Sequence, residues 1–163
     1  MSEKAARDYL ESRNAAGRIR RLDTSTATVS LAASAIGCEE ARIAKTVSLL
    51  GPDGKAVLVV TCGDTKIDNK KYKQQVGIKA KMIPFDRVEE MTGHAPGGVC
   101  PFGAPEGTII YIDSSLRRFD TVFPAAGSEW VILEASCDEL IAITGGTEAD
   151  LCSVRQPDKD QGC

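Results

Sequence analysis

Histidine, closely spaced cysteines and aromatic residues are scarce in this sequence. One histidine, His94, occurs among 163 residues, and the six cysteines stand far apart, at positions 38, 62, 100, 137, 152 and 163. Zinc sites need cysteine and histidine ligands at short, recurring spacings, so a familiar zinc motif is excluded. Isolated cysteines are typical of small buried hydrophobic side chains, and we expect them to be reduced thiols.

The sequence also has no long apolar run. The N-terminal residues MSEKAARDYLESR are charged and lack the hydrophobic core of a signal peptide, and no stretch approaches the length that spans a bilayer. The formal net charge of -3 gives no sign of a membrane or nucleic-acid partner for the molecule as a whole. We expect a soluble, cytoplasmic protein that binds neither membrane nor DNA.

The length and the hydrophobic content of 42% suit one domain with its own core. We expect this domain to occupy residues 1–151. The segment that follows, CSVRQPDKDQGC, has little apolar periodicity, so residues 152–163 are predicted to form a flexible tail.

Apolar residues at helical spacing, bounded by capping residues, predict several helices. The second of these ends at Gly37, and the third is capped by Asp68 and ends at Gly77. The predicted helices cover residues 3–14, 25–36, 67–77, 85–93 and 137–144, with a short turn of helix at 114–118.

Runs rich in β-branched residues predict strands between these helices. Residues 45–50 and 55–62 flank Gly51-Pro52-Asp53-Gly54, which suits a tight reversal, and so predict a hairpin. Further strands are expected at 18–22, 107–113, 121–127 and 129–136. Because helix and strand signals interleave and one hairpin is present, we predict an α/β (α+β-like) fold with a mixed, partly antiparallel central sheet flanked by helices.

The loop at 93–107 holds five of the fifteen glycines and three of the seven prolines. Glycine leaves no Cβ between backbone and ligand, and proline stiffens the chain. Consecutive N–H groups can therefore point into one concavity that suits an anion or a developing oxyanion. The loop has neither the Gly-Lys-Ser/Thr of a P-loop nor the strand-then-helix context of a dinucleotide fingerprint. An irregular connection with ordinary turn glycines is the alternative.

Lys45 is an unusual residue for its place in a strand. Alternation puts its side chain on the same side as Ile43, Val47 and Leu49, so its ammonium is directed toward the apolar face, where a charge needs a partner. Alternatively, Lys45 begins the strand and extends its head to water.

His94 lies in the glycine-rich loop and has two interpretations. An imidazole titrates near neutral pH and can accept a proton from water, which makes His94 a candidate base. A single histidine in a loop is otherwise a hydrogen-bonded structural residue.

One segment, residues 66–81, is strongly basic, with six lysines against the single acid Asp68. If the helix extends as predicted, Lys66, Lys70 and Lys73 form a stripe at i, i+4 and i+7 that suits a phosphate backbone. A solvated surface face is the alternative. Since aromatic residues make up only 5%, we expect any RNA to be recognised by its shape or its end, not by base stacking.

Several segments together resemble the YbaK family, the free-standing relatives of the editing domain inserted in bacterial prolyl-tRNA synthetases. The similarity runs from about Ser25 to Gly146. It rests on STATVSLAASAIG, the lysine-threonine pair in IAKTVSLL, the strand AVLVVTCGD, the segment IDNKKYKQQVG, the loop GHAPGGVCPFG and the strand end YID. The resemblance implies the fold of that editing domain.

The resemblance also implies an enzyme, an aminoacyl-tRNA deacylase that hydrolyses the ester of mischarged tRNA, with tRNA(Pro) as the expected substrate. It implies action in trans on the acceptor end, without a metal ion or organic cofactor. In the family pattern Lys45, followed by Thr46, contacts the terminal adenosine, and Asp113 of YID matches a position that helps to hold substrate in some relatives. The Gly-x-x-x-Pro loop that embraces the aminoacyl carbonyl corresponds to Gly97, Gly98, Val99, Cys100 and Pro101.

Backbone N–H donors at Gly97 and Gly98 would then stabilise the negative charge on the carbonyl oxygen. The ribose hydroxyl of the substrate would orient the attacking water, and His94 would shape the loop. Two rival functions stay open. One is a non-catalytic module that binds aminoacyl-tRNA or a nucleotide, and the other is a cysteine-dependent hydrolase that uses Cys100 with His94 as its base.

Overall fold

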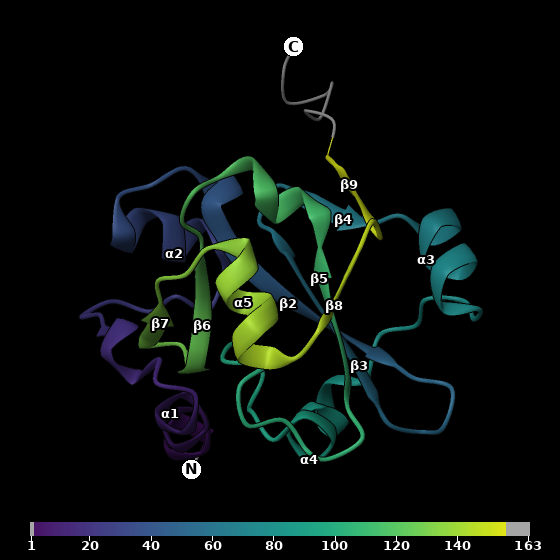
Figure 1. The fold of residues 1–163 in the computed structure, drawn as a ribbon, viewed down its shortest axis with the longest axis horizontal. Helices are drawn as coiled ribbons and strands as arrows, with labels where there is room; N and C mark the ends of the chain where they lie inside the picture. Colours follow the sequence, from purple (N-terminus) through teal and green to yellow (C-terminus); the bar gives the residue numbers. More distant parts are fainter. Residues whose placement is uncertain (1, 156–163) are drawn as a thin grey trace.

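A mixed sheet of seven strands runs through the protein in the computed structural model, which describes residues 2–155 (Figure 1). Three of its six strand pairs are antiparallel and three are parallel. The predicted mixed, partly antiparallel sheet is thus confirmed. In spatial order the strands are β1 (Ile19–Arg21), β7 (Val131–Leu133), β6 (Phe123–Ser128), β2 (Ile43–Leu50), β3 (Ala56–Cys62), β5 (Ile109–Asp113) and β8 (Thr147–Ala149).

The predicted hairpin is the centre of this sheet. β2 and β3 pair antiparallel from Ala44↔Cys62 to Leu50↔Ala56. Every residue of β3 is buried, as expected for a strand covered on both faces. In the connecting turn Gly54 has a φ of 76°, a left-handed conformation that glycine adopts without a steric penalty.

Five α-helices are formed by residues 2–155, at the places where the sequence predicts them. They are α1 (Ser2–Ser12), α2 (Val29–Ile36), α3 (Asn69–Val76), α4 (Val88–Thr92) and α5 (Cys137–Thr144). None of the helices in this part of the chain is long and apolar enough to cross a membrane. Short 3-10 turns join them, namely η1 (Ala16–Arg18), η2 (Glu40–Arg42), η3 (Phe85–Arg87) and η4 (Ser114–Arg118).

The start of α2 differs from the prediction. The predicted helix spans residues 25–36, whereas the N-cap is Thr28, because Thr28 has an extended backbone and its hydroxyl accepts a hydrogen bond from the amide of Leu31. Residues 25–28 are therefore a non-helical segment that leads into the helix. The predicted cap of α3 is confirmed, since the Asp68 carboxylate accepts from the amides of Lys70 and Lys71.

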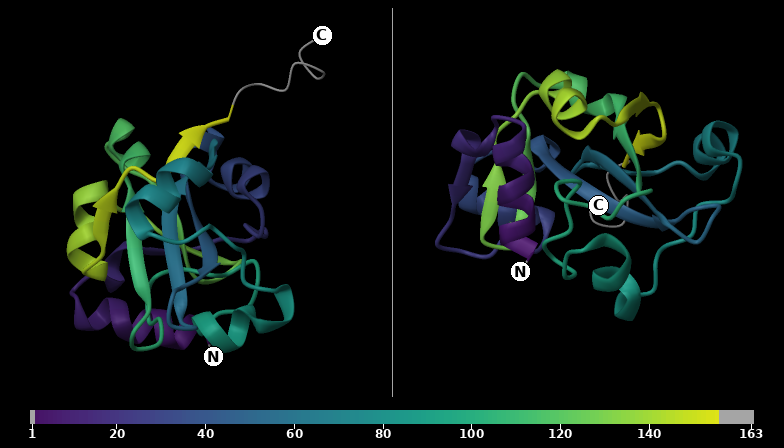
Figure 2. Two further views of the ribbon diagram at one scale, coloured as in Figure 1. Left: turned by 90° about the vertical axis from the view of Figure 1, so that its right-hand side faces the viewer. Right: turned by 60° about the horizontal axis from the view of Figure 1, so that its bottom comes forward.

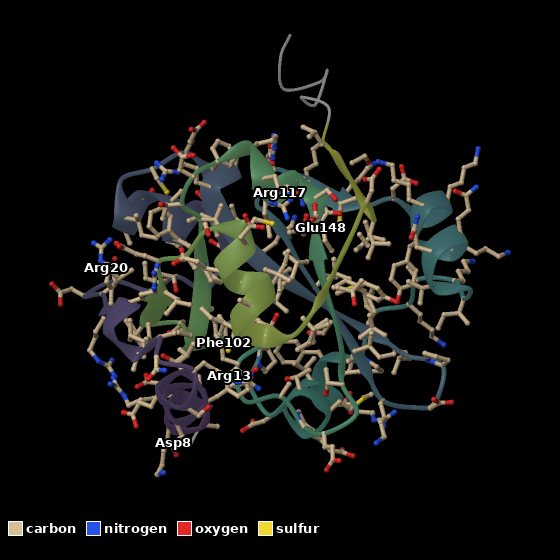
Figure 3. The ribbon with its side chains drawn as sticks, viewed as in Figure 1. Asp8, Arg13, Arg20, Phe102, Arg117 and Glu148 are labelled. Carbon is tan, nitrogen blue, oxygen red and sulfur yellow. The ribbon has the colours of Figure 1, made fainter. Side chains whose placement is uncertain are left out.

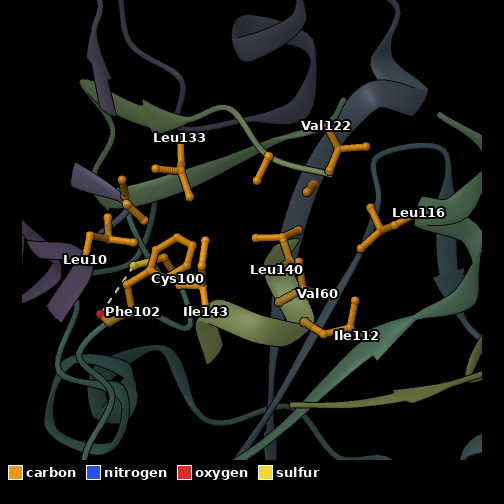
Figure 4. Packing of buried hydrophobic residues seen from close by; sticks show 14 of the residues in the cluster. Leu10, Val60, Cys100, Phe102, Ile112, Leu116, Val122, Leu133, Leu140 and Ile143 are labelled. Atoms are coloured by element: carbon orange, nitrogen blue, oxygen red, sulfur yellow. Dashed lines mark hydrogen bonds between the residues drawn. The ribbon is translucent and has the colours of Figure 1, made fainter. Parts of the chain in front are cut away.

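Helices cover both faces of the sheet. On one face α1 lies beside β6, and α5 packs over β3 and β5 (Figure 2). The apolar cluster beneath them is built from residues such as Leu10, Val60, Ile112 and Leu140 (Figure 4). On the other face α3 buries Tyr72 against Val57 and other residues of β2 and β3.

The C-terminal part of the described chain adds a second, two-stranded sheet. β4 (Thr65–Ile67) pairs antiparallel with β9 (Cys152–Val154). The predicted tail boundary after Leu151 is thus wrong for residues 152–154, because their backbone groups pair with β4. Residues 156–163 of the predicted tail lie outside the described residues.

The β4–β9 pair also corrects the predicted basic stripe. Lys66 lies in β4, opposite Ser153, so it does not share a helix with Lys70 and Lys73. Those two lysines lie three residues apart on α3, and all three side chains are exposed. A basic surface is present here, but it does not follow a single helix face.

The sheet splits between β2 and β6. These strands pair in parallel only at Ile43↔Phe123 and Ala44↔Pro124. Pro124 has no N–H to donate to a ladder. Beyond it, the pairing of β6 with β7 is irregular between Ala125 and Ser128, as at a β-bulge, which bends a strand. β2 therefore continues without β6 beside it from Lys45 onward.

Asp113, at the end of β5, connects several chain segments inside the protein. It is 1% exposed. One carboxylate oxygen accepts from the amides of Leu151 and Cys152 at 2.8 and 3.1 Å. The other oxygen accepts from the Ser115 amide at 3.1 Å and the Thr61 hydroxyl at 3.3 Å. Asp113 thereby ties β5, β3, η4 and the start of β9 together.

On the surface next to it, an ion pair joins η4 to β8. The guanidinium of Arg117 donates to both carboxylate oxygens of Glu148, at 2.8 and 2.7 Å (Figure 3). Because this pair is partly exposed to solvent, it contributes little to stability, and the buried Asp113 is the stronger connection.

We predict that Asp113→Asn lowers the free energy of unfolding by about 2–3 kcal/mol, because an amide nitrogen then faces N–H donors and buried donors lose their acceptor. Urea denaturation followed by circular dichroism measures this change. Asp86→Asn, at an exposed position of η3, is the matched control and should stay within about 0.5 kcal/mol of the original protein. Equal stabilities of the two variants would contradict the structural role of Asp113.

Candidate functional site

A cavity of about 340 Å³ opens where the sheet splits. β2 contributes Lys45 and Thr46 to its wall, and the glycine-rich loop contributes Gly97 and Val99. The other lining residues are mostly apolar: Thr26, Ala27, Thr28, Val29, Ala32, Ile43, Ala44, Phe123, Ala125 and Ile132. The split thus creates a site with few polar groups, all of which come from β2, the loop and residues 26–28.

Lys45 lies on the predicted face of β2 and is half-buried. Its Nζ donates to the carbonyl of Thr65 at the start of β4. Burial, and secondarily the positive charge of Arg155, lower the pKa of Lys45 below its ordinary value. An ammonium held by one carbonyl keeps two further N–H donors for an anionic or hydroxyl-bearing ligand.

Thr46, the next residue, has a side-chain hydroxyl whose hydrogen-bonding capacity is unused. Its Oγ1 is buried and has no hydrogen-bond partner within residues 2–155. A buried hydroxyl without a partner costs free energy, so a hydrogen bond to Thr46 Oγ1 would stabilise the site. The lysine-threonine pair that the sequence singles out is thus part of the cavity wall.

The loop supplies fewer backbone donors than the sequence predicts. Gly98 donates its N–H to the carbonyl of Ala95 at 3.0 Å, so this amide is not available to a ligand and its predicted donor role is wrong. The amides of Gly97 and Val99 have no hydrogen-bond partner in the described part of the chain, and both residues line the cavity. These two amides, separated by Gly98, are the available backbone donors.

Gly98 instead allows the loop to lie close to β6. A Cβ at this position would stand 2.6 Å from the Cα of Ser128, a distance that real Cβ atoms do not reach. Gly97 has a φ of 92°, which side-chain-bearing residues rarely adopt. Gly98 is therefore required because the loop lies so close to β6, and Gly97 because its backbone is left-handed.

His94 is inside the loop and does not line the cavity. It is 0% exposed, and its Nε2 lies 2.8 Å from the carbonyl of Phe102. Burial lowers the pKa of His94 below its ordinary value. Because a carbonyl oxygen only accepts, Nε2 is the donor in this hydrogen bond. Thr92 completes the arrangement, because its hydroxyl accepts from the His94 amide at 3.2 Å. Of the two interpretations, the geometry favours the structural one.

Cys100 and Pro101 are likewise buried and turned away from the cavity wall. The Cys100 side chain lies in the apolar cluster with Leu10 and Phe102, where Figure 4 marks its contact with the Phe102 carbonyl. Burial raises the pKa of the Cys100 thiol to about 12. Although Sγ lies 3.4 Å from His94 Nε2, a thiol so far from ionisation and so deeply buried is a poor nucleophile.

Asp113 does not reach the cavity either. Its carboxylate is buried beyond Thr61, with both oxygens engaged by the hydrogen bonds described above. The predicted direct contact with substrate is therefore not available to Asp113 in this structure, because the residue does not line the cavity and is 1% exposed.

The segment that leads into α2 was missed as part of the site. Thr26, Ala27 and Thr28 line the cavity, and Val29 and Ala32 continue its wall along the helix. The run of threonines before α2 is the sequence feature that indicates a polar, non-helical segment in the cavity wall. Phe123, Ala125 and Ile132 carry no such signal, since only the pairing of β6 with β7 brings them to the site.

Comparison with known proteins supports the importance of this region. A family model, described as the aminoacyl-tRNA editing domain, matches residues 23–143. YwhH of Bacillus subtilis (strain 168), a protein described as uncharacterized, is 45% identical over 140 residues, which cover 86% of this chain and 89% of YwhH.

Two solved structures share the fold over nearly the whole chain. One is described as a candidate trans-editing enzyme for prolyl-tRNA synthetase; it has a TM-score of 0.84 and 32% identity, and the match covers 93% of this chain and 97% of that one. The other, the hypothetical protein APE2540, has a TM-score of 0.82 and 29% identity, with coverage of 91% and 99%.

The matched region from residue 23 to residue 143 contains every residue that lines the cavity, as well as the glycine-rich loop. The fold thus agrees with the sequence match, and the chain belongs to the aminoacyl-tRNA editing domain family.

Proposed function

We propose that this protein is an aminoacyl-tRNA deacylase that hydrolyses the ester bond of mischarged tRNA in trans. The observation that carries the proposal is the cavity itself. It joins an ammonium (Lys45) and an unpartnered hydroxyl (Thr46) to two free backbone amides (Gly97 and Val99). In this proposal residues 1–154 form one editing domain that acts in the cytoplasm, where charged tRNAs are used.

The two amides stabilise the transition state of ester hydrolysis. When water attacks the ester carbonyl, negative charge develops on the carbonyl oxygen, and each N–H donor fixed in place lowers the barrier by about 3 kcal/mol. Gly97 and Val99 provide these donors. Gly98 and His94 are positioning residues, because one lets the loop approach β6 and the other joins its two halves through Phe102.

Lys45 and Thr46 hold the nucleoside end of the substrate. The two N–H groups of Lys45 that Thr65 leaves free suit the ribose and phosphate oxygens of the terminal adenosine, and the Thr46 hydroxyl adds a further hydrogen bond. Hydrolysis forms a bond from the water oxygen to the carbonyl carbon and breaks the ester bond, so a ribose hydroxyl leaves. The neighbouring ribose hydroxyl orients the water.

The choice of tRNA(Pro) rests on the similar structure described as a candidate trans-editing enzyme for prolyl-tRNA synthetase. The exposed Lys66, Lys70 and Lys73 support contact with the acceptor stem, since they present positive charge on β4 and α3 without a recorded ion pair among the described residues.

We predict that the protein releases amino acid from tRNA(Pro) charged with at least one of alanine, cysteine and serine, with many turnovers for each protein molecule. Acid-precipitable counts from labelled aminoacyl-tRNA, present in tenfold or greater excess, measure the rate. If the protein releases no more than one amino acid per protein molecule, or binds the charged tRNA without releasing any, the result supports the non-catalytic binding module instead of the deacylase. No release across a wider panel of amino acids would rule out the deacylase.

We predict that Lys45→Ala lowers kcat/KM for deacylation about 100-fold, because a charge-assisted contact worth about 3 kcal/mol is lost. The melting temperature should change little, since the replaced side chain is only half-buried. Lys55→Ala, at the exposed far end of the β2–β3 hairpin, is the control and should retain full activity. Full activity in Lys45→Ala would remove this residue from the mechanism.

We predict that Cys100→Ser retains deacylase activity within about threefold, because the serine hydroxyl can donate to the Phe102 carbonyl as the thiol does. The same steady-state assay measures the rate. A loss of more than 100-fold in a variant that remains folded by circular dichroism would instead favour the cysteine-dependent hydrolase.

A further inference from the structure

A carboxylate stands at the rim of the cavity, on the turn between β6 and β7. We propose that this residue, Glu129, binds the α-ammonium group of the aminoacyl ester and so restricts the enzyme to substrates whose amino group is free. The inference rests on the proposed deacylase function and adds a substrate class to it.

The position of Glu129 is defined by the loop beside it. A Cβ built on Gly97 would lie 3.7 Å from Oε2 of Glu129 and 3.5 Å from the Cβ of Ala27. Gly97 and Ala27 both line the cavity. Glu129 itself lines a smaller hollow of about 170 Å³, which it shares with Gly98, Trp130 and Pro96. The carboxylate is therefore at the border between the cavity and this hollow.

The backbone that presents Glu129 is held firmly. Its carbonyl accepts from both the amide and the hydroxyl of Thr26, at 2.6 and 2.8 Å. Trp130, the next residue, donates its amide to the Ser128 hydroxyl at 3.1 Å, and its carbonyl accepts from the Leu22 amide at 2.8 Å. These bonds fix the turn against the cavity wall, so the carboxylate extends from a rigid support.

The charge of Glu129 has no partner in residues 2–155. No ion pair or side-chain hydrogen bond is recorded for its carboxylate there, whereas Glu3 on nearby α1 pairs with Arg21 and accepts from Ser128. A half-buried, unpaired carboxylate repels the phosphates of a tRNA end and is unfavourable unless a cation binds it.

The substrate supplies such a cation at the right place. In an aminoacyl ester the α-amino group is two bonds from the reacting carbonyl carbon, and at neutral pH it is a cation or a strong hydrogen-bond donor. When the carbonyl oxygen binds the amides of Gly97 and Val99, the ammonium must lie within a few ångströms of Gly97. That is where Oε2 of Glu129 stands.

This arrangement identifies the class of ester that the site accepts. Formylated, acetylated or peptidyl esters carry a neutral, bulkier amide in place of the ammonium, and they would leave the carboxylate without a partner. A trans-acting deacylase that meets every charged tRNA would thereby spare initiator and peptidyl esters.

The test compares one aminoacyl-tRNA(Pro) that the protein hydrolyses with its chemically N-acetylated form. We expect the protein to prefer the free-amine ester by at least tenfold in kcat/KM. Glu129→Gln should lose about tenfold on the free-amine ester and change little on the acetylated one, so that the preference disappears. Glu89→Gln, at an exposed position of α4, is the matched control and should keep the preference.

A binding measurement makes the test independent of turnover. A non-hydrolysable, amide-linked aminoacyl adenosine and its N-acetyl derivative are titrated calorimetrically into the protein and into Glu129→Gln. The proposal is supported if the original protein binds the free-amine compound more tightly than the acetylated one and Glu129→Gln shows no such difference. An unchanged preference in Glu129→Gln, in either assay, overturns this inference and leaves the deacylase intact. Absence of hydrolysis of either ester by the original protein overturns the deacylase and this inference together.

Discussion

The separation of β6 from β2 is the constraint on which the site depends. A parallel pair normally continues as far as both strands extend, and here it stops after Ala44↔Pro124 because proline has no N–H and β6 is irregular just beyond it. The opening exposes Lys45 and Thr46 to a space that the loop and α2 enclose. A continuous ladder at this point would fill the space with paired backbone and leave no room for a ligand.

Buried polar groups hold the surrounding structure in place. His94 and Asp113 are both inaccessible; His94 binds the Phe102 carbonyl within its own loop, and Asp113 binds backbone amides from a segment distant in sequence. The role of Asp113 follows from the cost of an unpaired polar group in the interior, which makes a fully hydrogen-bonded carboxylate a rigid connector. The loop that carries Gly97 and Val99 is stiff because His94 joins it to Phe102.

The cavity and its rim carry charges of opposite sign in different environments. Lys45 is half-buried and already bonded to a carbonyl, so it suits an oxygen-rich ligand, whereas Glu129 at the rim is unpaired. A molecule with a ribose and phosphate at one end and an ammonium at the other would satisfy both. An aminoacyl-tRNA end has this distribution of charge around its ester, which relates the family membership to the geometry of this particular chain.

The sequence by itself determined the helices, the β2–β3 hairpin, the side of β2 that Lys45 occupies and the family, because these depend on local periodicity, turn chemistry and a run of matching segments. Only the tertiary structure decided which polar residues reach the cavity. Asp113, His94, Cys100 and the Gly98 amide are equivalent candidates along the chain. In the structure Asp113 binds the distant amides of Leu151 and Cys152, and the other three have partners inside the folded loop. Glu129 shows the converse: it has no local signal, and only the packing of a turn against a loop brings its carboxylate to the site.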